Sequence, residues 1–139
     1  HAEHAAGRGP LGTKASPVGF TICGSASVYF AGDTDLFDSM GEIGPLDVAL
    51  LPIWGWGASL GPGHLDPRRA AESVALLRAR IAVPIHWGTY YPLHLKPGYF
   101  LREPPEEFER AAAELAPETE VQVLALGESL TLPAARTVR

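Results

Sequence analysis

Carboxylate and imidazole side chains stand directly after apolar segments at two places in this sequence. Asp33 and Asp35 follow the glycine that ends "VYFAG", and His86 follows "IAVPI". His64 lies between a glycine-rich stretch and the start of a predicted helix. Aspartate and histidine are ligands of zinc and similar transition metals, whereas an aspartate near a helix start also acts as a cap. The pattern is therefore compatible with two roles for these side chains, metal binding and helix capping.

Each of these residues also has an interpretation without catalysis. Asp33, with Thr34 beside it, could cap the turn that follows. His86 could be a core histidine hydrogen-bonded to the backbone, and His64 could be a loop residue without a role. Taken one by one, the residues do not decide between these alternatives.

Short strands and helices are predicted to position these side chains. The β-favouring apolar stretches predict two strands within 18–32, around a Gly24-Ser25 turn, and two more over 46–54 and 81–85. Helical spacing and start signals, with Asp66 as N-cap and Pro67 as first residue, predict a helix over 65–80. The remaining expectations are a short helix or turn over 35–44, a helix over 105–115 and a final hairpin over 120–132.

Strands and helices alternate through the middle of the chain, which is typical of a sheet covered by helices. In such architectures the carboxyl ends of strands are where side chains from distant parts of the chain converge. We therefore expect the carboxylate of Asp33 and the imidazoles to meet at one edge of the sheet, where they would form a plausible transition-metal site.

Length and composition fit one globular domain over 1–139, with 46% hydrophobic and 19% charged residues. The net charge of −5 gives no indication of the basic surface that nucleic-acid binding requires. No apolar run reaches the roughly 18 residues of a membrane span. The single cysteine excludes a disulfide framework, so a cytoplasmic protein is expected. The sequence opens on His1 rather than Met, and we expect the natural chain to be longer.

The order "HAEH", "YFAGDTD", "GHLDPRRAAE" and "PIHWGTY" resembles the C-terminal half of the metallo-β-lactamase superfamily. It is most similar to the branch of N-acyl-phosphatidylethanolamine phospholipase D-like and ascorbate-6-phosphate lactonase-like hydrolases. The resemblance covers residues 1 to about 132. It implies an α+β, four-layer αββα metallo-β-lactamase fold, of which this chain is about the C-terminal half, with one mixed sheet and covering helices.

The resemblance also implies roles for individual residues. His4 would bind one metal, His86 would bind the other, and Asp33 would bridge them. His64 would sit beside the metals without binding them, where it would hydrogen-bond the substrate or the developing oxyanion. The implied cofactor is zinc, two ions in the intact parent, with manganese or iron as alternatives.

The chemistry implied is metal-dependent hydrolysis. A metal-bridging hydroxide would attack an ester, lactone or phosphodiester of a small-molecule substrate. Trp54, Trp56 and Tyr90 would line the substrate pocket, although tryptophans more often serve packing alone. No partner nucleic acid and no membrane span are expected.

The sequence departs from the family pattern in one respect. It has no His-x-His-x-Asp-His segment, which in the family supplies two ligands to each metal and lies in the N-terminal half. This leaves open whether the chain is active alone. We expect an exposed apolar sheet face, and association either with a missing N-terminal half or as a homo-oligomer. The alternative function is a non-catalytic binding or assembly domain that retains the fold.

Overall fold

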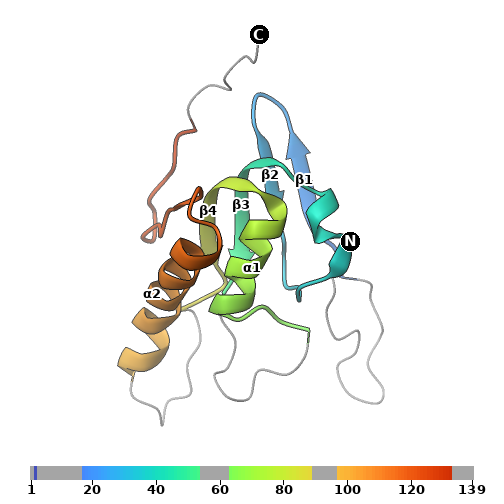
Figure 1. The fold of residues 1–139 in the computed structure, drawn as a ribbon. Coiled ribbons are helices and arrows are strands. Elements are labelled where there is room, and N and C mark those ends of the chain that lie inside the picture. The colour runs from blue at the N-terminus through green and yellow to red at the C-terminus, as the bar shows by residue number, and fades with distance from the viewer. Residues whose placement is uncertain (1, 3–16, 54–62, 89–96, 133–139) are drawn as a thin grey trace, which may run out of the picture.

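The computed structural model describes residues 2, 17–53, 63–88 and 97–132 of the chain. Its centre is a five-stranded sheet with the order β1-β2-β3-β4-β5 (Figure 1). The first strand runs antiparallel to the second, and the later neighbours pair in parallel. The strands are β1 (Phe20–Cys23), β2 (Ser27–Phe30), β3 (Leu46–Pro52), β4 (Ala79–Ile85) and β5 (Glu120–Val121). The strands predicted within 18–32 and over 46–54 and 81–85 are thus found.

The helix predicted over 65–80 is found as α1 (Pro67–Leu77). Its start is the one expected, because the backbone N–H of Arg69 donates to the side chain of Asp66 over 2.8 Å. The helix ends at Arg78, which takes a left-handed conformation. A short 3₁₀ helix, η1 (Asp38–Glu42), occupies the stretch where a short helix or turn was expected.

The helix predicted over 105–115 is longer than expected, since α2 spans Pro97–Leu115. Pro104 and Pro105 lie inside it rather than at its start. A proline removes one main-chain donor from a helix. Both prolines are buried here, so apolar packing of their rings offsets that loss.

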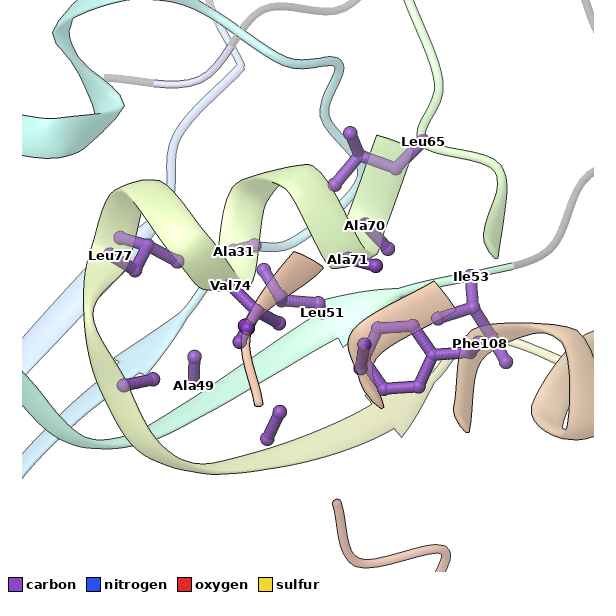
Figure 2. Packing of buried hydrophobic residues seen from close by; sticks show 14 of the residues in the cluster. Ala31, Ala49, Leu51, Ile53, Leu65, Ala70, Ala71, Val74, Leu77 and Phe108 are labelled. Carbon is purple, nitrogen blue, oxygen red and sulfur yellow. The ribbon is translucent and has the colours of Figure 1, made fainter. Parts of the chain in front are cut away.

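The main core lies between one face of the sheet and the two helices (Figure 2). The sheet contributes small side chains to this core, Ala49, Ala79 and Ala82, as well as large ones such as Tyr29 and Leu51. Figure 2 shows Leu51 and Ile53 of the strand layer facing Val74 of α1 and Phe108 of α2, all fully buried. The core therefore packs β3 against both helices, and this packing supports the loops that follow the strands.

A second apolar cluster covers part of the opposite face. Val48, Ile81 and Val83 are buried there under Leu124, Leu130 and Leu132, which come from the segment after β5. The paired strands of the hairpin predicted over 120–132 are therefore wrong, although its turn is found. Among the described residues of that stretch only Glu120–Val121 is a strand, and it pairs in parallel with β4. The leucines pack onto the sheet face instead of entering a ladder, and a turn at Ala125–Glu128 reverses the segment.

The rest of this second face is open. Val18, Phe20, Ile22 and Phe30 are 57%, 59%, 62% and 41% exposed. Phe20 lies opposite Phe30 in the ladder, and Ile22 lies opposite Val28, which in turn neighbours Val48. Directly opposed residues share one face of a sheet. Among the described residues, the expected open apolar face is therefore found over β1 and β2, and we call these four exposed residues the open apolar patch.

Candidate active site

The carboxyl ends of β2, β3 and β4 lie at one edge of the sheet, because these three strands are parallel. Backbone hydrogen bonds continue the pairing to that edge. The N–H of Ala31 donates to Leu50, and the N–H of Ile53 donates to Ile85, each over 3.1 Å. Asp33 follows β2 and His86 follows β4, so the sheet delivers both to the same edge.

Asp33 and His64 lie next to each other at this edge. Nε2 of His64 is 3.6 Å from Oδ2 of Asp33, and the side chains are 26% and 40% exposed, respectively. Gly32 adopts φ of +68°, a conformation that L-residues avoid, and this turn carries the chain from β2 to Asp33. The capping alternative does not apply to η1, whose N-cap is Phe37. A carboxylate beside an imidazole, both open to solvent, is a pair able to contact a ligand.

The segments that carry this pair are joined by Asp35, whose role the sequence did not reveal. Its carboxylate accepts from the backbone N–H of Leu36 over 2.7 Å and from that of Gly63 over 2.9 Å. Nη2 of Arg69 lies 2.5 Å from its Oδ1. Both carboxylate oxygens of Asp35 thus have partners, either backbone N–H groups or the guanidinium of Arg69. The sequence offers only a weak signal for this, namely the adjacent arginines at the start of α1.

His86 is exposed, so the core-histidine alternative is wrong. Its φ of +59° is left-handed, which is uncommon for a residue with a Cβ. Gly88 also has positive φ, and the indole Nε1–H of Trp87 donates to the carbonyl of Pro84 over 3.2 Å. Backbone strain of this kind clusters at functional sites. The tight turn after β4 holds the His86 backbone at the sheet edge.

The other predicted site residues lie outside the described part of the chain: His4, Trp54, Trp56 and Tyr90. Within the described ranges, no group of three His, Cys, Asp or Glu side chains is placed to hold a metal ion. Asp33 and His86 have the donor chemistry that zinc takes, one carboxylate and one imidazole. The described donors therefore fit part of a metal site and do not complete one by themselves. None of the described helices is both long and apolar enough to cross a bilayer.

The chain belongs to the metallo-β-lactamase superfamily. The family model described as "Beta-lactamase superfamily domain" matches residues 1–87. The metallo-β-lactamase fold expected from the sequence is confirmed, with a mixed sheet and covering helices.

Several relatives carry a more particular description, "UPF0173 metal-dependent hydrolase". One from Caldivirga maquilingensis is 42% identical over 125 residues, which is 87% of this chain and 49% of the relative. Another, from Methanopyrus kandleri, is 38% identical over 133 residues, or 93% of this chain and 52% of the relative. The chain therefore spans about half the length of the curated relatives it matches.

Solved structures agree with this placement. Igni18, described as a novel metallo hydrolase from Ignicoccus hospitalis, superposes with a TM-score of 0.68 at 31% identity. The match covers 97% of this chain and 52% of Igni18. The metallo-β-lactamase fold protein YhfI from Bacillus subtilis superposes with a TM-score of 0.58 at 16% identity, which shows the fold alone.

Proposed function

We propose that this chain is part of a metal-dependent hydrolase, and that the edge formed by β2, β3 and β4 carries its active site. The observation that supports this best is the pairing of Asp33 with His64 at 3.6 Å, beyond the strand ends where α/β proteins bind ligands. Membership of the superfamily and the resemblance to metal-dependent hydrolases point the same way.

Asp33 and His86 are the described residues that would contribute to holding the metal. In this proposal Asp33, His86 and His4 would hold two zinc ions, with Asp33 shared between them; manganese or iron is an alternative. A bound metal of this kind supplies an activated water at neutral pH and polarises the bond to be cleaved. His64 would not bind the metal; its imidazole, next to the Asp33 carboxylate, would hydrogen-bond the substrate.

The proposed substrate is a small molecule with an ester, lactone or phosphodiester bond. Trp54, Trp56 and Tyr90 are the proposed pocket residues. The finer placement, beside N-acyl-phosphatidylethanolamine phospholipase D-like and ascorbate-6-phosphate lactonase-like hydrolases, rests on the motif resemblance and stays a prediction, as does the cytoplasmic location.

The proposal is tested with the full-length gene product. Metal content is measured by elemental mass spectrometry after incubation with zinc, together with hydrolysis of a p-nitrophenyl ester, a simple lactone and bis(p-nitrophenyl) phosphate. We expect Asp33→Ala to lose bound zinc and turnover while circular dichroism keeps its shape. The matched control is Asp38→Ala, which removes an exposed carboxylate of η1. Equal metal content and turnover in wild type and Asp33→Ala would refute the proposal.

The open apolar patch supports a second candidate, a binding or assembly domain without catalysis. The patch also bears on the partner of a hydrolase. Since the relatives are about twice as long, we propose that the part of the fold outside this chain covers it, with self-association of the chain as the alternative. Under the assembly candidate, Asp33→Ala leaves partner binding unchanged. Under the hydrolase candidate it abolishes turnover.

A further inference from the structure

Two loops that are far apart in sequence lie side by side at the candidate site. One contains 33–36, after β2, and the other contains 63–66, before α1. The backbone N–H of Leu65 donates to the carbonyl of Thr34 over 2.9 Å, and the Leu65 side chain is buried in the main core. One backbone hydrogen bond and one buried side chain therefore already anchor the residue after His64.

Asp35 anchors the residue before His64. Its Oδ2 accepts from the backbone N–H of Gly63 over 2.9 Å, and its Oδ1 is paired with the guanidinium of Arg69 at 2.5 Å. The Asp35 side chain is 17% exposed, so water competes little for these bonds. Hydrogen bonds to an ionised carboxylate are about twice as strong as neutral ones.

Arg69 is itself held on a rigid element. Its backbone N–H is bound by the N-cap residue Asp66, and its carbonyl accepts from the hydroxyl of Ser73 over 3.0 Å. The face of α1 beneath it, with Ala70 and Val74, is fully buried. The Asp35–Arg69 pair thus ties the loop after β2 to a packed helix.

We propose that Asp35 and Arg69 are positioning residues that fix the His64 imidazole beside the Asp33 carboxylate. The inference rests on the proposed function, in which the side chains of Asp33 and His64 face the metal and the substrate. With Gly63 held by Asp35 and Leu65 held by Thr34, the backbone on both sides of His64 is restrained. Reactions in enzymes depend on such placement to within a fraction of an ångström.

The first test measures the restraint without any catalysis. Amide hydrogen exchange of the full-length gene product is followed at Gly63 and Leu65, with the sheet amide of Ile53 as internal reference. We expect Asp35→Asn and Arg69→Gln to speed exchange at Gly63 and Leu65 by at least about tenfold, because local opening depends on these bonds. Exchange at Ile53 should not change.

The matched control is Arg68→Gln. Arg68 neighbours Arg69 on α1, but its guanidinium pairs with Glu114 of α2 on the exposed surface and not with Asp35. This substitution should leave the Gly63 and Leu65 amides protected. Unchanged exchange at both amides in Asp35→Asn would overturn the proposal, whether or not the protein proves to be a hydrolase.

The second test asks whether Asp35 acts through His64. With bis(p-nitrophenyl) phosphate as probe, we expect Asp35→Asn to lower kcat by about tenfold or more with little change in KM. Arg69→Lys, which keeps the charge, should recover part of the rate lost in Arg69→Gln. In a His64→Ala background the effect of Asp35→Asn should disappear. Additive losses in the double variant would show that Asp35 does not work through His64, and would overturn the proposal. Absence of turnover in wild type would count against the proposed function and leave the exchange result to decide the restraint.

Discussion

Asp47 and Ser27 join β3 to β2 at the end of the sheet opposite the candidate site. The backbone N–H and the hydroxyl of Ser27 both donate to Oδ2 of Asp47, over 2.8 and 3.0 Å. The backbone N–H of Asp47 donates back to the Ser27 hydroxyl over 2.9 Å, and Arg80 of β4 donates to the other carboxylate oxygen over 2.7 Å. One carboxylate therefore links three adjacent strands.

This arrangement predicts a pH-dependent contribution to stability. The hydrogen bonds from Ser27, and then the contact with Arg80, hold the pKa of Asp47 below its usual value. Stability from a carboxylate with a lowered pKa is present above its unfolded pKa of about 4 and is lost as the pH falls through the folded value. Asp47→Asn should cost about 1 kcal/mol at pH 7. That cost should shrink below about pH 4, as measured by urea unfolding at pH 7 and pH 3.

The control for this prediction is Glu109→Gln, on the exposed surface of α2. It should give the same free energy of unfolding as wild type at both pH values, to within about 0.5 kcal/mol. If the free energies of unfolding of wild type and Asp47→Asn differ by the same amount at pH 7 and pH 3, the proposed role of the ionised Asp47 carboxylate is wrong.

The second prediction concerns the contact between Gly44 and the end of α1. A Cβ on Gly44 would stand 1.9 Å from the carbonyl oxygen of Leu77 and 2.6 Å from its carbonyl carbon. Both are backbone atoms that cannot rotate away. Gly44→Ala should therefore destabilise the fold by about 2–4 kcal/mol. Gly24→Ala is the control, because nothing lies within 4 Å of a Cβ there, and thermal unfolding should distinguish the two clearly.

The third prediction uses the left-handed backbone of His86. Glycine accepts φ of +59° without a steric penalty, whereas alanine retains the strain of the native residue. His86→Gly should therefore be more stable than His86→Ala by about 1 kcal/mol in chemical unfolding. Both variants should lose the metal affinity proposed for the imidazole. Equal stability of the two variants would show that the turn relaxes at no cost.

The fourth prediction tests the open apolar patch. The isolated 139-residue chain should self-associate through it, and Ile22→Thr should weaken that association roughly tenfold, since Ile22 is 62% exposed. Sedimentation velocity over a concentration series measures the effect. Leu126→Thr is the control, because Leu126 is fully exposed at a turn away from the patch. A comparable effect of both substitutions would show that the patch has no special role.

Local signals in the sequence predicted the strands β1 to β4 and the helix α1, but not the start of α2 or the segment after β5. The helix α1 was predictable because its cap and first residue, Asp66 and Pro67, are adjacent and chemically distinctive. The conformation of the segment after β5 was not predictable, because its alternating leucines are compatible both with a hairpin and with an extended segment packed on a sheet. Only the position of Val48, Ile81 and Val83 beneath it decides between them.

The candidate site was predictable in part. Asp33 and His64 were singled out from the sequence, and the structure brings them to 3.6 Å. The role of Asp35 could not be inferred, because its partners Gly63 and Arg69 are distant in sequence and are brought close only by the packing of α1 on the sheet. Tertiary contacts of this kind leave no periodic pattern in the chain.

The leucines that cover the second sheet face carry a consequence for biosynthesis. Leu124, Leu130 and Leu132 are translated after every strand that they shield. A ribosome-bound chain that already contains β2, β3 and β4 therefore exposes Val48, Ile81 and Val83 until these last residues leave the exit tunnel. During that interval the nascent sheet is a surface for chaperones that bind apolar segments, and release from them should coincide with emergence of residue 132.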